Sequence, residues 1–202
     1  MPAGYTLAFT GENEDVEETQ AFLIRAFGVA LLLVTLVIVA QFNSILQTVV
    51  IMTSVILSVG GVILGLLICD MPFGILMTGI GCISLAGVVV NNGIVLLDFV
   101  NQLRAKGVPL EDAVIEAGII RFRPVMLTAT TNVLGLVPMA LGISFDFKNF
   151  HFTSGGETAE WWGPMATAVI FGMTYATVLT LVFVPTLYTY AINLSELFKG
   201  KP

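Results

Sequence analysis

Apolar residues run through this chain in long blocks that short polar segments separate. Five blocks are each long enough to cross a bilayer, which takes roughly 20 helical residues. They cover about 21–41, 46–69, 74–100, 124–143 and 165–192. The blocks are continuous rather than alternating, and alternation is what the strands of a membrane β-barrel require. The pattern therefore predicts an all-α integral membrane protein with five transmembrane helices.

Two of the connections carry patterns of their own. Pro109, Glu111 and Asp112 are typical of a helix start, and a partial apolar stripe follows them. We therefore expect a short amphipathic helix over about 108–121, lying at the membrane surface. The aromatic stretch SFDFKNFHFTSGGETAEWW, between the fourth and fifth blocks, predicts a long interfacial loop.

Small residues and prolines mark positions inside the blocks. Gly61 and Gly65 form a GxxxG pattern in the second block. The pattern either marks a close helix contact or reflects the general frequency of glycine in membrane helices. Pro138 and Pro185 should each bend or end a helix.

The charged residues predict an orientation. Most positive charges lie in the connection after the third block or behind the last block: Arg104, Lys106, Arg121, Arg123, Lys199 and Lys201. The opposite side carries mainly acids. The positive-inside rule then places the N-terminus outside and the C-terminus, with a tail over 193–202, in the cytoplasm.

Composition supports the membrane assignment and excludes other classes. The chain is 56% hydrophobic and only 11% charged, against about a quarter charged in soluble domains. Its net charge of −6 and the lack of a basic stripe argue against nucleic-acid binding. Cys69 and Cys82 are interpreted as small packing residues, and His151 has no second metal ligand beside it. No enzyme motif occurs, so we expect no catalytic residue, cofactor or metal.

Polar residues interrupt the third and fourth blocks at helical spacing. In the third block the spacing runs through Ser84, Gly87, Asn91, Val95 and Asp98. In the fourth block it runs through Arg121, Pro124, Thr128, Thr131 and Gly135. Asn91 and Asp98 should share one helix face, with Asn92 pointing about 100° away. An unpaired amide is costly in hydrocarbon. If the two helices pack through these stripes, Asn91 can pair with Thr128 or Thr131.

Two interpretations of these stripes stay open. In the first, the polar residues hold neighbouring helices together through hydrogen bonds. In the second, they line a path for ions or protons, the default hypothesis for ionisable groups inside a membrane. Asparagine and threonine do not titrate, and this chain has no carboxylate at mid-membrane. A proton path would therefore need an acid from elsewhere.

The motifs resemble a known family. GVVVNNGIVLLDFV, with RFRPVMLTATTNVLGLVPMA, closely resembles the tenth and eleventh transmembrane helices of the resistance-nodulation-division (RND) efflux pumps. The branch it resembles exports hydrophobic and amphiphilic compounds. WWGPMATAVIFGMTYATVLTLVFVPTLY resembles the last helix of these pumps, and MPAGYTLAFTGENED the end of their second large periplasmic loop. The resemblance implies helices eight to twelve of a pump, with residues 1–20 as a remnant of the periplasmic porter region.

The resemblance also implies a set of proton-relay residues. In that family, paired aspartates on the fourth helix work with a lysine on the tenth and an arginine and threonine on the eleventh. Motif alignment puts Asn91 at the lysine, Arg121 at the arginine and Thr128 at the threonine. Neighbouring polar residues are expected to support them: Asn92, Asp98 and Thr131. Asn91 departs from the lysine, and the aspartate helix is not in this chain.

The resemblance further implies a location and partners. We expect a multi-pass protein of the bacterial inner membrane, part of a proton antiporter that confers multidrug resistance. The complete pump would be a homotrimer with a periplasmic adaptor and an outer-membrane channel. This chain, a fragment by that comparison, would need the N-terminal half of the pump and contact membrane lipid. The heavy-metal branch is less favoured, because no acid replaces the asparagines and no methionine series suggests a metal relay.

Two other functions remain as alternatives. The five helices could form a non-transporting membrane scaffold, or a split-pump subunit that binds a separately encoded N-terminal half. A more distant alternative is a protein-secretion accessory subunit of the same superfamily.

Overall fold

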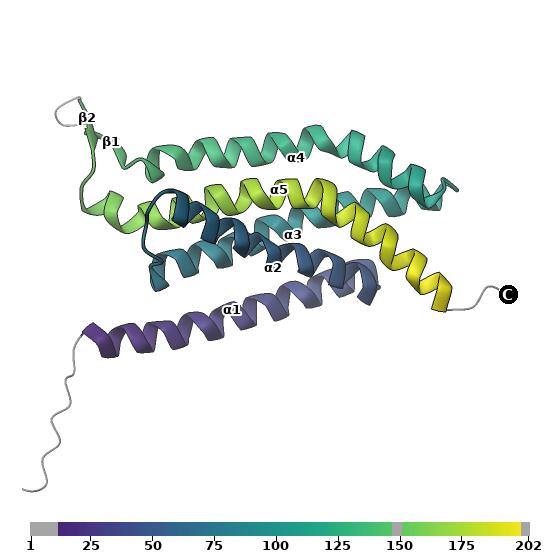
Figure 1. Ribbon diagram of the computed structural model, residues 1–202, viewed down its shortest axis with the longest axis horizontal. Coiled ribbons are helices and arrows are strands. Elements are labelled where there is room, and N and C mark those ends of the chain that lie inside the picture. Colours follow the sequence, from purple (N-terminus) through teal and green to yellow (C-terminus); the bar gives the residue numbers. More distant parts are fainter. Residues whose placement is uncertain (1–11, 147–150, 199–202) are drawn as a thin grey trace, which may run out of the picture.

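The computed structural model of the protein describes residues 12–146 and 151–198 as a bundle of long helices (Figure 1). The helices are α1 (Glu12–Phe42), α2 (Ile45–Ile68), α3 (Ile75–Ala105), α4 (Leu110–Ala140) and α5 (Glu157–Phe198). Two short strands, β1 (Ile143–Asp146) and β2 (His151–Ser154), lie between α4 and α5. The prediction of a helical fold with five long helices is confirmed.

Successive helices run in opposite directions, so the connections gather at two ends of the bundle (Figure 1). The connections after α1 and α3 lie at one end, which we call the basic end because Arg104 and Lys106 lie there. The connection after α2 and the two strands lie at the other end, which we call the hairpin end. Which end faces the cytoplasm stays a prediction from the basic residues.

In the described part of the chain, four helices are long and apolar enough to cross a membrane, by length and composition. These spans are Val16–Phe42, Ile45–Ile68, Ile75–Ala105 and Ala159–Leu194. The expected fourth span belongs to α4, which falls outside this set. A polar run from Thr128 to Asn132 lowers the hydropathy of α4, and charged residues occupy its first half. The helix that resembles a membrane span least is therefore the one that holds two of the three predicted relay residues, Arg121 and Thr128.

The short interfacial helix expected over about 108–121 is not a separate element. It forms the first part of α4 and continues through Pro124 without a break. A proline inside a helix removes one backbone hydrogen bond and commonly bends the helix rather than ending it. Figure 1 accordingly shows α4 as one curved ribbon, and α5, which contains Pro164 and Pro185, also bends.

The aromatic stretch after α4 is not the long irregular loop that we expected. β1 and β2 pair antiparallel, with Phe145 opposite Phe152. The alternation of phenylalanine with polar residues in SFDF and HFTS has the period of two that favours a strand. Residues 147–150 lie outside the described part. α5 begins at Glu157, so Trp161 and Trp162 belong to a helix.

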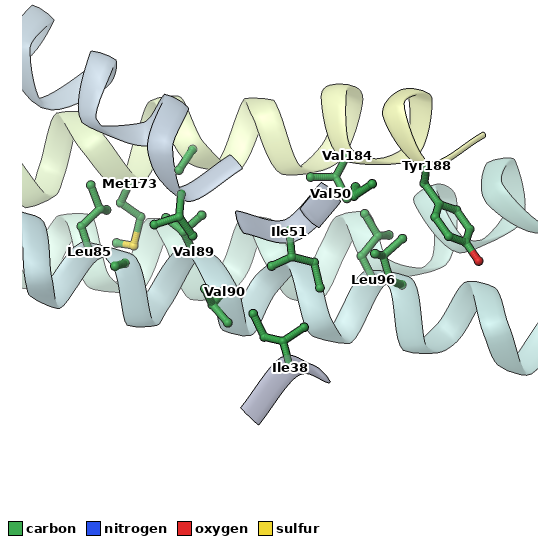
Figure 2. Close-up of a cluster of buried hydrophobic side chains, with 14 of the residues drawn as sticks. Ile38, Val50, Ile51, Leu85, Val89, Val90, Leu96, Met173, Val184 and Tyr188 are labelled. Carbon is green, nitrogen blue, oxygen red and sulfur yellow. The ribbon is translucent and has the colours of Figure 1, made fainter. Parts of the chain in front are cut away.

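α5 runs through the middle of the bundle and packs against α2, α3 and α4. The largest fully buried side chains come from α1, α2, α3 and α5 and meet between these helices (Figure 2), among them Ile38, Ile51, Leu85, Leu96, Met173, Val184 and Tyr188. A methyl group at Gly61 would overlap the side chain of Tyr175, and one at Gly65 would overlap Phe171. The GxxxG pattern therefore marks a close contact of α2 with α5.

α1 lies at the edge of the bundle (Figure 1). Only 11% of its most apolar stretch is buried, against 50% for each of the other three candidate spans. Its exposed side chains include Phe22, Leu32 and Leu36, which are apolar. A contiguous apolar surface of this kind is covered by lipid or by further protein in a membrane.

Candidate relay site

The two adjacent asparagines of α3 face different surroundings. Asn91 is exposed, whereas the side chain of Asn92 is buried, with 7% of its surface exposed. Neighbouring positions on a helix point about 100° apart, so only one of the two can turn into the core. In this bundle Asn92 takes the inward position and Asn91 faces outward.

Thr128 and Thr131 of α4 are exposed, and each hydroxyl donates a hydrogen bond within its own helix. The Thr128 hydroxyl donates to the carbonyl oxygen of Val125 at 2.9 Å, and the Thr131 hydroxyl donates to that of Leu127 at 2.8 Å. Threonine in a helix commonly bonds to a preceding carbonyl in this way. Among the described residues, neither threonine bonds to Asn91. The expected pairing across α3 and α4 is therefore wrong.

These residues form what we call the exposed polar set: Asn91, Thr128 and Thr131. On α4 the set lies among exposed apolar side chains, since Leu127 and Leu134 are 67% and 64% exposed, with Thr130 and Asn132 also exposed. An amide and two hydroxyls on the outer surface of a membrane bundle retain hydrogen-bonding capacity that lipid tails cannot fill. The set is therefore suited to meet polar groups of another helix.

Arg121 lies about two helical turns before Thr128 on α4 and packs on an aromatic ring. Its guanidinium carbon is 4.6 Å from the centre of the Phe99 ring on α3. Its Nε atom is buried and has no hydrogen-bond acceptor. Asp98, next to Phe99, instead accepts a hydrogen bond from Gln102 at 2.8 Å. Within the described ranges, no acid forms an ion pair with Arg121. The structure thus brings Arg121 against α3 but gives it no anion.

A second group of polar residues was missed by the sequence analysis. Gln47 of α2, Asn101 of α3 and Tyr188 of α5 form what we call the buried polar cluster. Gln47 and Tyr188 are 9% and 1% exposed, and Asn101 is half-buried. Figure 2 shows the Tyr188 ring extending away from α5. The one sequence signal for this cluster was Gln47, a polar residue at the start of the second apolar block.

The buried polar cluster is closed by four hydrogen bonds. Gln47 Nε2 donates to Asn101 Oδ1 at 3.0 Å and to Tyr188 Oη at 3.1 Å. Asn101 Nδ2 donates to Gln47 Oε1 at 3.1 Å, and Tyr188 Oη donates to Asn101 Oδ1 at 3.1 Å. Each side chain thus bonds to both others. The cluster ties α2, α3 and α5 together and leaves little capacity for an outside partner.

Metal-ligating residues do not gather in the part of the chain that the structure describes. There, no three His, Cys, Asp or Glu side chains lie close enough together to hold a metal ion. Cys69 is exposed, Cys82 is half-buried, and both are free thiols. No metal site is assigned to these residues.

Comparisons with known proteins place the chain among transporters. A family model described as the AcrB/AcrD/AcrF family matches residues 1–191. The chain is similar to the cobalt-zinc-cadmium resistance protein CzcA of Cupriavidus metallidurans, with 37% identity over 97% of the chain and 17% of CzcA. It is also similar to the multidrug resistance protein MdtC of Erwinia amylovora, with 27% identity over all of the chain and 19% of MdtC.

A solved structure agrees with this placement. The crystal structure of a heavy metal efflux pump superposes with a TM-score of 0.76 and 27% identity, over 97% of this chain and 18% of that one. The chain therefore spans less than a fifth of the length of the relatives and of the structure that it matches. The predicted RND resemblance is confirmed at the level of the family. The predicted branch is not, because the relatives include proteins named for metal resistance as well as for multidrug resistance.

Proposed function

Because this chain belongs to the AcrB/AcrD/AcrF family of RND transporters, we propose that it is the C-terminal membrane part of a proton-driven efflux transporter. The observation that carries the proposal is the exposed polar set on α3 and α4. In a multi-pass membrane protein these groups require polar partners, and among the described residues they have none on another helix. Helices of the rest of the transporter, which carry the titrating acids by family resemblance, are the proposed partners.

The side chains suit a role beside a proton-carrying acid. The Thr128 hydroxyl donates to a carbonyl of α4, so its oxygen lone pairs can accept a hydrogen bond from a protonated acid. Once the acid has lost its proton, the hydroxyl can turn and donate to the carboxylate. The Asn91 amide can likewise accept from the acid or donate to the carboxylate, without the charge of a lysine. Three residues would support this site: Asn92, Asp98 and Thr131.

Arg121 is the proposed source of positive charge at this site. The relay of the family contains two cations, a lysine and an arginine. Asn91 stands at the position of the lysine, so Arg121 is the one cation of the two that is present here. An arginine guanidinium is protonated at all physiological pH values, so it favours the ionised form of a nearby acid. We propose that Arg121 lowers the proton affinity of that acid from the basic end of α4.

The rest of the assignment follows from the family. We propose an inner-membrane location with the basic end in the cytoplasm, and assembly as a homotrimer with a periplasmic adaptor and an outer-membrane channel. The transported compounds are proposed from the names of relatives. Four relatives are named for resistance to or efflux of metals or cations, and two of these four are 37% identical to this chain. Metal cations are therefore the first candidate, and hydrophobic or amphiphilic compounds the second.

The relay role can be tested by segment replacement. The matching segment of CzcA is replaced by this chain, and resistance to cobalt, zinc and cadmium is measured in cells that lack other metal exporters. Arg121→Ala and Thr128→Ala should each reduce resistance at normal protein levels. Thr174→Ala is the matched control, because Thr174 is also exposed and its hydroxyl also donates to its own helix, at 2.7 Å from Ile170 O. Normal resistance in both test variants would end the relay assignment.

The cargo needs a separate test, because CzcA supplies most of the replaced transporter. The gene that encodes this chain is deleted in its own host, and growth is measured with cobalt, zinc and cadmium salts and with lipophilic dyes. Greater sensitivity to the salts alone supports metal cations. Greater sensitivity to the dyes alone supports the amphiphile class instead.

A further inference from the structure

The contact between Arg121 and Phe99 joins two helices near the proposed relay. Arg121 lies on α4 and Phe99 on α3, and both side chains are half-buried. The guanidinium carbon lies 4.6 Å from the ring centre, within the distance over which a cation and an aromatic face attract each other. The attraction is stronger where water is excluded, as it is in a membrane bundle.

An acid in place of the ring would change the chemistry of Arg121. A carboxylate would pair with the guanidinium and occupy its donors through two parallel hydrogen bonds. Asp98 is adjacent to Phe99 in sequence, but its carboxylate accepts from Gln102 on its own helix. An aromatic ring holds a cation through its face and accepts no strong hydrogen bond. The terminal nitrogens of Arg121 therefore keep their donors for another group.

We infer that Phe99 is a positioning residue that holds the guanidinium of Arg121 against α3 and keeps it free for an acid from outside this chain. The inference rests on the proposed function, since that acid belongs to the rest of the transporter. The buried Nε atom, which has no acceptor, agrees with a guanidinium placed by the ring rather than by hydrogen bonds. Loss of the ring would let the long arginine side chain sample other rotamers and weaken its action on the acid.

The test compares substitutions that remove the ring with one that keeps it. In the CzcA-based transporter described above, Phe99→Met retains an apolar side chain of similar size but removes the aromatic face. We expect resistance or metal export to fall about threefold to tenfold. Phe99→Tyr keeps the face and should retain normal export. Phe122→Met is the control, because Phe122 is next to Arg121 in sequence but is 53% exposed and has no ring contact with it.

A spectroscopic measurement makes the result independent of transport. The chain has four arginines, so arginine-selective ¹⁵N labelling of the full chain in lipid nanodiscs gives few Nε–H signals. The Arg121 signal should be displaced upfield by the ring, and Phe99→Met should remove the displacement while Phe122→Met retains it. An Arg121 signal that does not respond to Phe99→Met would overturn the inference.

The two proposals fail in different ways. If Arg121→Ala reduces export but Phe99→Met behaves like Phe122→Met, the inference is wrong and the relay assignment stands. If Arg121→Ala leaves export normal, the relay assignment is wrong, whatever the Arg121 signal shows. If Phe99→Tyr loses export as fully as Phe99→Met, the ring face is not what matters and the inference is again overturned.

Discussion

The buried polar cluster and the exposed polar set contain similar side chains in opposite situations. In the cluster, Gln47, Asn101 and Tyr188 each bond to both others across three helices. In the set, Asn91 is exposed and the threonines bond only to their own helix. The cluster makes its hydrogen bonds between helices of this chain, whereas within the described ranges the set makes none between helices. The polar groups that hold these helices together are thus different residues from those for which we propose a partner outside this chain.

The sequence left two interpretations of its polar residues open, attachment between helices and a proton path. The difference between the two regions relates each interpretation to different residues. Hydrogen-bonded attachment between helices fits the cluster, which the sequence analysis did not identify. The relay interpretation is the one that we propose for the exposed polar set and Arg121. Substitutions in the two regions should therefore affect different properties, the cluster mainly the free energy of unfolding and the set mainly transport.

The largest effect on stability is expected from Gln47→Leu. It removes three of the four hydrogen bonds of the cluster and leaves Asn101 and Tyr188 with only the bond between them. We expect the free energy of unfolding to fall by about 2 to 4 kcal/mol. Denaturant unfolding of the full chain in detergent measures this. Thr53→Val, in the same helix and with a hydroxyl bonded to Val49 O, is the control, and an equal loss in both would break the comparison.

A smaller effect is expected from Tyr188→Phe. The ring stays in the core, but the bond from Gln47 Nε2 and the bond to Asn101 Oδ1 are lost. The remaining pair between Gln47 and Asn101 should limit the loss to about 1 to 2 kcal/mol. Combining Tyr188→Phe with Gln47→Leu should cost less than the sum of the two single changes, because they share a bond. A fully additive double variant would mean that the cluster does not act as a unit.

The smallest effect on stability is expected from Asn91→Leu. Asn91 is exposed, so its replacement by an apolar residue should change the free energy of unfolding by less than about 0.5 kcal/mol. Transport in the CzcA-based transporter should nevertheless fall, because the acid loses an amide partner. A destabilisation as large as that of Tyr188→Phe would show that Asn91 holds the bundle together, and would remove the distinction between the two regions.

Much of the fold could be predicted from the sequence. The five helices follow from long apolar blocks. Gly61 and Gly65 indicated a close helix contact as one of two interpretations, but the sequence did not identify α5 as the partner. The continuity of α4 could not be predicted, because whether Pro124 ends or bends a helix depends on its neighbours. The strand pair after α4 was predictable in principle from alternating phenylalanines, but the aromatic content favoured an interfacial loop.

The candidate site was harder to predict than the fold. Spacing put Asn91 and Asn92 on different faces but did not decide which face turns inward, since that depends on how α3 packs with α2 and α5. The position of Phe99 relative to Arg121 depends in the same way on the packing of α3 against α4. Three polar residues that are separated by 54 and 87 positions form the buried cluster, and periodicity within one helix cannot detect such a group.

Measuring transport and stability together on two variants tests the central claim most directly. In the CzcA-based transporter, metal export per folded molecule and the free energy of unfolding are measured for Thr128→Ala and Tyr188→Phe. The account predicts that Thr128→Ala loses export with unchanged stability, while Tyr188→Phe loses stability with unchanged export per folded molecule. Thr128→Ala that exports normally, or that loses export only in proportion to lost stability, would contradict the account.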